Sequence, residues 1–234
     1  MNKYLTLVLA ILFSTFAFAD DYIIVAVSGL RTIREKSKTE DVLSNQIDKS
    51  GEVSGVWSNA PTKEYSAKIN YTAYLTHFSK DSEINSVLQL FLDENKICKN
   101  NVRMILMVNS WGAKVSQVLS KKYEKLCGSK PLMSFMIEGI SKPTPSAYTK
   151  DLISEECINI FQTKSNLHGD RINNCKNFVF TYPNQSTSLF NSHLETEWHG
   201  GELAKDSILK FLSKSQSKFT INIERFSREG LTEL

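Results

Sequence analysis

Long apolar runs are scarce in this sequence, and so is charge of one sign. Only residues 5–19 form a long apolar run, which excludes a protein that crosses a membrane many times. The 28 Lys and Arg residues nearly balance the 25 Asp and Glu residues, giving a formal net charge of +3. This balance indicates neither a nucleic-acid partner nor an anionic membrane surface. With 41% hydrophobic residues, the composition is that of a globular protein.

The apolar run at the amino terminus is typical of a cleavable secretory signal. Lys3 precedes it, and the small-residue pattern Ala17, Phe18, Ala19 closes it. It is too short and too well punctuated for a membrane anchor. No linker rich in Pro, Gly or Ser divides the remainder. We therefore expect a signal at 1–19, a single domain at 20–234 with no transmembrane segment, and a periplasmic or secreted protein.

Apolar segments rich in β-branched residues alternate with amphipathic helical segments along the mature chain. Parallel strands need a crossover, usually a helix, to bring the chain back, so this alternation predicts a three-layer α/β sandwich with a mostly parallel sheet. Strands are expected at 22–27, 71–78, 102–108, 132–137, 158–162 and 178–182, with an edge strand at 219–224. Helices are expected at 39–47, from a Ser82 cap to Leu92, at 113–126 and around 204–212, with a loop at 50–63.

Cysteine is also scarce, and all four copies lie in the exported part. An oxidising compartment lets such an even set pair, and the absence of a CxxC element argues against a zinc site. Cys98 and Cys127 each precede a predicted strand and are expected to pair. Cys157 and Cys175 bracket a strand and its return loop, so they form the second expected pair.

The segment after the predicted strand 102–108 carries the strongest chemical signal. Asn109, Ser110, Trp111 and Gly112 follow that strand directly and lead into a helix. A tight turn between strand and helix pushes a serine hydroxyl outward, and the helix start offers backbone N–H groups to a developing oxyanion. A serine in this position more often caps the helix, so further residues are needed to support a catalytic role.

The segment VNSWGA resembles the nucleophile elbow of the α/β-hydrolase superfamily, specifically of small lipase-like or esterase-like members that have Gly-His-Ser-Trp-Gly-Gly. Ser110, Trp111 and Gly112 agree with that pattern. Val108 stands where the family has a small residue, and Ala113 replaces a second glycine. We expect the branched side chain of Val108 to crowd the strand and helix at the elbow.

The resemblance implies positions for the oxyanion hole and the general base. Gly29 follows the first strand, where the family's oxyanion loop lies, so the backbone N–H groups of Leu30 and Trp111 would form the oxyanion hole. The family also places a histidine in the loop before the last long helix. His193 has the more usual separation from that helix and is preferred, with His199 as the alternative.

Two acids compete for the role of orienting the histidine. Glu138 directly follows the strand 132–137, the strand end that one branch of lipases uses. Asp170, in the segment HGDRI, occupies the later loop that most other members use. Glu138 is ranked slightly ahead, and both acids stay open.

Metal and nucleotide chemistry are not supported. His193 and His199 are six residues apart, which is not HExxH spacing, and no phosphate-binding glycine loop occurs. The sequence therefore predicts a hydrolase without a cofactor, cleaving a carboxylic ester or thioester of a small molecule or lipid. Residues 141–156 are too short for a large lid, which favours a small esterase-like site. The alternatives are a non-catalytic binding protein on the same scaffold, motivated by Val108, and a structural envelope protein.

Overall fold

A seven-stranded sheet organises the chain. The computed structural model describes residues 21–29, 54–141, 146–164, 168–181, 191–214, 219, 221 and 230–234. The strand order is β2-β1-β3-β4-β7-β8-β9, and all neighbours are parallel except β9, which is antiparallel to β8. The strands are β1 (Asp21–Ser28), β2 (Ile69–Thr76), β3 (Val102–Asn109), β4 (Met133–Ile137), β7 (Glu156–Gln162), β8 (Lys176–Phe180) and β9 (Leu231–Glu233).

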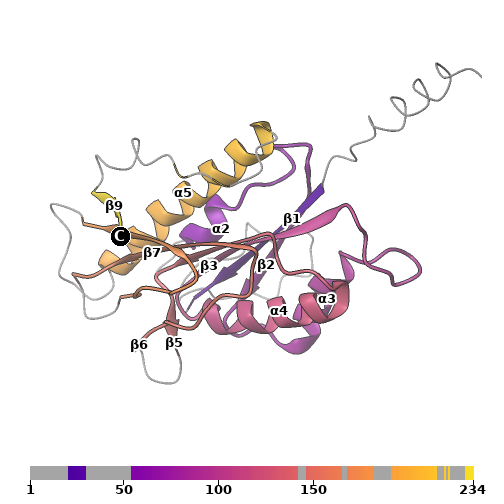
Figure 1. Ribbon diagram of the computed structural model, residues 1–234, viewed down its shortest axis with the longest axis horizontal. Helices are drawn as coiled ribbons and strands as arrows, with labels where there is room; N and C mark the ends of the chain where they lie inside the picture. The colour runs from indigo at the N-terminus through magenta and orange to yellow at the C-terminus, as the bar shows by residue number, and fades with distance from the viewer. Residues whose placement is uncertain are drawn as a thin grey trace, which may run out of the picture.

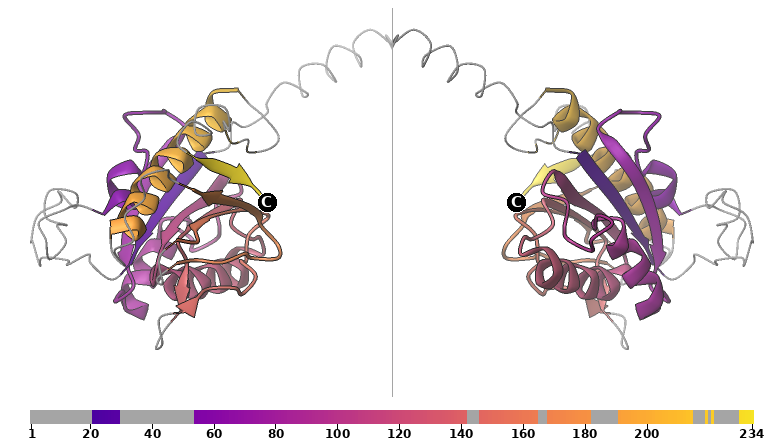
Figure 2. Two further views of the ribbon diagram at one scale, coloured as in Figure 1. Left: turned by 90° about the vertical axis from the view of Figure 1, so that its left-hand side faces the viewer. Right: turned by 90° about the vertical axis from the view of Figure 1, so that its right-hand side faces the viewer.

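Helices cover both faces of this sheet. Helices α2 (Gly55–Asn59) and α5 (Asn191–Lys214) lie on one face (Figures 1 and 2). Helices α3 (Asp81–Gln89) and α4 (Gly112–Cys127) lie on the other. A small antiparallel hairpin, β5 (Ile140–Ser141) with β6 (Ser146–Ala147), follows β4. The predicted α/β class with a mostly parallel sheet is confirmed.

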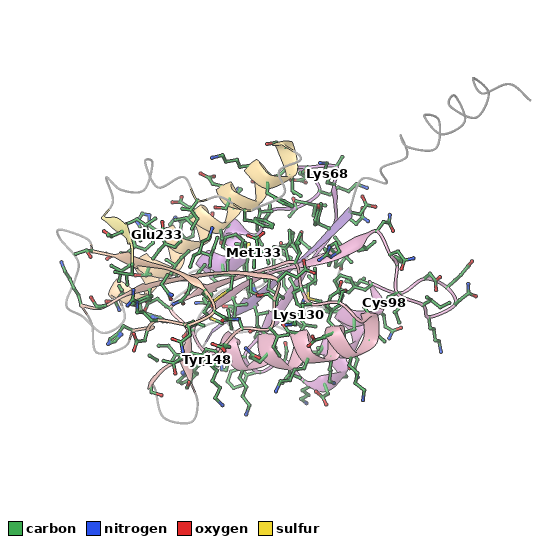
Figure 3. The ribbon with its side chains drawn as sticks, viewed as in Figure 1. Lys68, Cys98, Lys130, Met133, Tyr148 and Glu233 are labelled. Carbon is green, nitrogen blue, oxygen red and sulfur yellow. A yellow bond between two sulfur atoms is a disulfide. The ribbon has the colours of Figure 1, made fainter. Side chains whose placement is uncertain are left out.

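Two hydrophobic clusters fill the space between the sheet and its helices. Successive side chains of a strand point to opposite faces, so strands that are buried on both faces are apolar at most positions. In β1, Ile24 packs in the cluster that contains Trp57 of α2, and its neighbour Val25 packs in the cluster that contains Leu119 of α4. Figure 3 shows Met133 within the sheet, between the two helical layers.

Several element boundaries differ from the sequence prediction. The predicted loop 50–63 contains α2, and β9 was not predicted. Helix α3 has its N-cap at Lys80 and not at Ser82, because the Lys80 backbone N–H donates to the Glu83 carboxylate and fixes an earlier start. The last helix starts at Asn191, well before the predicted segment. The signal at 1–19, the helix at 39–47 and most of the edge strand at 219–224 lie outside the described residues.

Two disulfides join the pairs that the sequence predicts. Cys98 bonds to Cys127 and so ties the segment before β3 to the end of α4, while Cys157 bonds to Cys175. Gly128 ends α4 with a φ of 68°, the left-handed conformation expected of a terminating glycine. The disulfides are consistent with an exported protein. Among the helices described here, none combines the length and apolarity needed to cross a membrane.

Candidate active site

Ser110 lies in the turn between β3 and α4 and has a strained backbone. Its φ is 49°, a conformation that residues with a side chain rarely adopt. The close contact of this elbow falls at Gly112, where an added Cβ would lie 2.7 Å from the Val27 carbonyl oxygen. Val108 is fully buried in the core. The strained turn therefore forms although position 108 is a valine. Gly112, a glycine that this elbow shares with the family pattern, is the position with no space for a side chain.

The end of β1 meets Ser110 from the neighbouring strand. A Cβ at Gly29 would lie 2.5 Å from the Ser110 Cβ, and the Gly29 N–H donates to Asn109 Oδ1 at 2.7 Å. Strand order reverses between β1 and β3, and such a switch point is where open α/β sheets bind ligands. Trp111 is the N-cap of α4 beside Ser110. Leu30, the other predicted oxyanion donor, lies outside the described residues.

Glu138 occupies the corresponding turn after β4 and is held against the Ser110 turn. Its φ is 50°, and it is fully buried. The Ser110 N–H donates to the Ile137 carbonyl at 3.1 Å, and the Ile140 N–H donates to the Ser110 carbonyl at 3.2 Å. These two backbone bonds flank Glu138 on both sides. The serine and glutamate turns are therefore one hydrogen-bonded unit at the carboxyl edge of the sheet.

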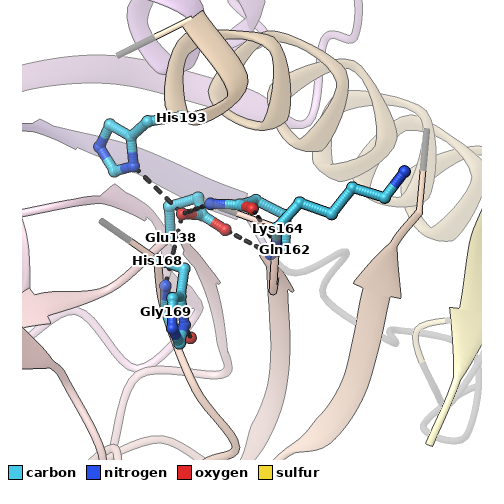
Figure 4. Close-up of polar contacts among 6 residues, drawn as sticks. All are labelled: Glu138, Gln162, Lys164, His168, Gly169 and His193. Atoms are coloured by element: carbon cyan, nitrogen blue, oxygen red, sulfur yellow. Dashed lines mark hydrogen bonds and ion pairs between the residues drawn. The ribbon is translucent and has the colours of Figure 1, made fainter. Parts of the chain in front are cut away.

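The Glu138 carboxylate contacts His193. Its Oε2 atom lies 3.1 Å from His193 Nδ1 (Figure 4). Its Oε1 accepts the backbone N–H of Gln162 at 2.5 Å, and Oε2 accepts that of Gly169 at 3.3 Å. The Gln162 amide Nε2 adds a longer contact of 3.4 Å to Oε2. Bonds from two backbone segments fix the carboxylate plane, so they also fix the direction in which it orients the imidazole.

His193 lies in the first turn of α5 and not in a loop before it. The helix starts early enough to include this residue, which is 7% exposed. The hydrogen bonds of the described residues do not include one between the Ser110 hydroxyl and His193. Catalytic hydrogen bonds often form only when substrate binds. The predicted approach of these two side chains stays a prediction.

The two alternative residues make other contacts. Asp170 is exposed, and its carboxylate accepts the backbone N–H of the next residue, Arg171, at 2.7 Å. His199 lies within α5, with Nδ1 3.6 Å from the Glu202 carboxylate and its ring 6.2 Å from the Phe180 ring. The structure therefore brings Glu138 and His193 together and assigns Asp170 and His199 other partners.

An aromatic group borders the Gly29 turn. His77 follows β2, and its Nδ1 lies 2.7 Å from the Gly29 carbonyl oxygen. Its ring lies 3.7 Å from the Phe78 ring and 5.6 Å from the Trp111 ring, centroid to centroid. Phe78 is 67% exposed. The carboxyl ends of β2 and β3 thus carry three neighbouring aromatic rings beside the Gly29 turn.

A second buried carboxyl group lies near His193 and was missed in the sequence. Glu197 Oε1 accepts the Ser54 hydroxyl at 2.6 Å. Burial raises the pKa of Glu197 above its ordinary value, while the Ser54 bond and the nearby His193 lower it. The sequence signal for Glu197 was its position four residues after His193, because residues at this spacing share one face of a helix.

Gln162 and Asn109 were missed as well. Each is the last residue of a buried strand, β7 and β3 respectively. A polar residue at such a position is the signal for both, since strand ends collect functional groups in parallel sheets.

No group of three or more His, Cys, Asp or Glu side chains in the described part of the chain is arranged to hold a metal ion. Comparison with models of known protein families gives no match, and no curated protein matches the chain significantly. The chemistry of the site has to be inferred from its own geometry.

Proposed function

We propose that this chain is a serine hydrolase with an α/β-hydrolase-like fold that cleaves a carboxylic ester or thioester. The observation that carries the proposal is the unit formed by Ser110, Glu138 and His193. Two adjoining strand ends hold the serine and the glutamate in strained turns, and the glutamate contacts the histidine. These residues follow one another in the chain order that the superfamily uses: serine, acid, histidine.

The proposed reaction proceeds in two steps. The Ser110 oxygen attacks the substrate carbonyl carbon while its proton passes to His193 Nε2, the nitrogen that does not face Glu138. The bond to the leaving alcohol or thiol then breaks, and the leaving group takes that proton. Water next attacks the acyl-enzyme, giving its proton to His193. The acid departs, and the Ser110 oxygen regains the proton.

Negative charge develops on the substrate oxygen during both attacks. The start of α4 lies directly after Ser110, so the backbone N–H of Trp111 and the positive end of the helix dipole support that charge. Leu30 is proposed as the second donor. The Glu138 carboxylate stabilises the imidazolium that forms on His193, and burial of both groups strengthens this interaction.

The substrate is proposed to be a small-molecule or lipid ester in a periplasmic or extracellular space. The short hairpin β5 and β6 occupies part of the segment in which a large lid would have to lie. The exposed ring of Phe78 provides an apolar surface beside His77, whose Nδ1 contacts the Gly29 carbonyl oxygen. The apolar surface favours an acyl ester over a highly charged substrate, and the short hairpin favours a small esterase-like site.

Hydrolysis of 4-nitrophenyl esters with acyl chains from acetate to palmitate tests the proposal. The wild type should hydrolyse at least part of the series, and Ser110→Ala should lower kcat by a factor on the order of 10⁶. Ser116→Ala is the matched control, because Ser116 is a buried serine of α4 that donates to the Ala113 carbonyl. Absence of hydrolysis by the wild type across the series, or full activity in Ser110→Ala, would favour the non-catalytic binding protein.

A further inference from the structure

A chain of three buried side chains joins the helix of His193 to the turn at Gly29. Glu197 is one helical turn after His193 on α5 and is 6% exposed. Its carboxylate accepts the Ser54 hydroxyl at 2.6 Å, and the Ser54 oxygen in turn accepts the Ser28 hydroxyl at 2.9 Å. Ser28 is the last residue of β1 and directly precedes Gly29. These three side chains thus connect helix α5, which carries the proposed base, with the strand that leads into Gly29. Gly29 in turn lies against Ser110, the proposed nucleophile.

The backbones around these three side chains pack so closely that their glycines have no space for a Cβ atom. A Cβ at Gly55 would lie 2.9 Å from the Trp198 Cα, and one at Gly201 would lie 2.8 Å from the Gly55 carbonyl oxygen. A Cβ at Gly200 would lie 2.7 Å from Ile137 Cγ2. Figures 1 and 2 show α2 beside α5 on the same face of the sheet. Helix α5 therefore rests directly on α2 and on the strand that leads into Glu138, so a small shift of α5 would move His193.

We infer that Glu197 is a positioning residue that, through Ser54 and Ser28, sets where His193 lies relative to the Gly29 and Ser110 turns. This inference rests on the proposed function. Glu197 acts only through His193 and has no direct role in the chemistry. Because the three side chains are buried, loss of the Glu197 acceptor leaves the Ser54 hydroxyl without its partner, and the local packing must shift to compensate.

Four variants test the inference. Glu197→Leu removes the acceptor with a side chain of similar volume, and Ser54→Ala removes the link should the leucine variant fail to fold. Glu197→Gln keeps an acceptor oxygen and is the conservative replacement. Glu202→Gln is the matched control, since it removes a carboxylate from the same helix at a partly exposed position.

Amide hydrogen exchange measures the link without any assay of hydrolysis. Glu197→Leu and Ser54→Ala should accelerate exchange both in peptides covering 191–199 and in peptides covering 22–29, whereas Glu197→Gln and Glu202→Gln should stay close to the wild type. The two segments are far apart in sequence, so a joint response that Glu202→Gln does not share indicates that they are coupled through the buried contacts of Glu197 and Ser54. Unchanged exchange at 22–29 in both disrupting variants would overturn the inference, even in a protein with no esterase activity.

Steady-state kinetics measures the positioning. Glu197→Leu and Ser54→Ala should lower kcat by about 10- to 100-fold with KM nearly unchanged, because small displacements of a catalytic group cost rate more than binding. Glu197→Gln should recover most of kcat. If the wild type hydrolyses esters and the folded disrupting variants keep its kcat, Glu197 has no positioning role. A wild type without hydrolysis refutes the proposed function and the kinetic role together, while the exchange result still decides the link.

Discussion

Glu138 Oε2 lies 3.1 Å from His193 Nδ1, although 55 positions separate the two residues in the sequence. Both side chains are buried, and the Glu138 backbone has a φ of 50°. A strained backbone persists only where its surroundings hold it in place, and here two backbone N–H groups hold the carboxylate. Of the three described non-glycine residues with positive φ, two are Ser110 and Glu138. Strain at both residues supports the proposal that this contact belongs to a catalytic site.

Glu138→Gln should nearly abolish hydrolysis while the chain stays folded. An amide cannot stabilise the imidazolium, and it can favour the wrong histidine tautomer, so kcat should fall by about 10³- to 10⁴-fold. The measurement is kcat for the best ester substrate, with circular dichroism as the check on folding.

Asp170→Asn is the control for that experiment, since Asp170 was the competing acid and is exposed in the structure. It should keep the activity of the wild type. A large loss in Asp170→Asn together with a small loss in Glu138→Gln would reverse the assignment of the acid.

Gly29→Ala should impair activity more than stability. The added Cβ would lie 2.5 Å from the Ser110 Cβ and 3.0 Å from its Oγ, so the Ser110 side chain, the proposed nucleophile, has to move. Gly128→Ala is the matched control, because nothing lies within 4 Å of its added Cβ while its φ is 68°. It should cost about 1 kcal/mol of stability and leave kcat unchanged. Equal losses of activity in the two folded variants would argue against a catalytic role for the Gly29 turn.

The sequence predicted the sheet because its strands are apolar at successive positions and must be buried on both faces. It also placed Ser110 correctly at a strand-to-helix turn, since glycine and small residues follow the strand there. Both kinds of signal are local, because a strand's burial and a turn's geometry depend on neighbouring residues.

What the sequence could not provide were the contacts between distant segments. Choosing Glu138 over Asp170 required knowing which carboxylate contacts His193. That contact depends on how the segments that carry the two acids are arranged in space. The start of α5 was missed for a similar reason. Gly200 and Gly201 disfavour a helix locally, yet in the structure they let α5 pack closely on β4 and α2, and this packing outweighs their low helix propensity.

Removing either disulfide should destabilise the chain. The Cys98–Cys127 and Cys157–Cys175 bonds span 29 and 18 residues, and replacing either pair with alanine should cost on the order of 2 to 4 kcal/mol. Urea unfolding of the two double variants measures this cost. Peptide mapping without reductant checks the pairing, and free thiols or links between the two sets would contradict it.

Stability should depend on pH through Glu197. Burial raises its pKa in the folded chain above the ordinary value of 4.5, so the folded state holds this proton over a pH range in which the unfolded state releases it. The contribution of Glu197 to stability is therefore complete below pH 4.5 and is lost as pH rises through the raised pKa.

The free energy of unfolding should be measured for the wild type and for Glu197→Gln. The wild-type value minus the Glu197→Gln value isolates the titration of Glu197 from the titration of most other groups. Measured from about pH 4 to about pH 8, the difference should decrease with rising pH by at most about 1.4 kcal/mol per pH unit. A difference that stays constant or increases would show that the folded chain does not raise the pKa of Glu197.

Covalent labelling by a fluorophosphonate tests the central claim most directly, because only a serine activated by its neighbours reacts readily with this probe. Intact-mass and peptide analysis of the wild type should find one adduct, located on Ser110. The adduct should be absent in Ser110→Ala and should form much more slowly in His193→Ala. A folded wild type that acquires no adduct, or one that acquires it at another serine, would contradict the assignment of Ser110 as the nucleophile.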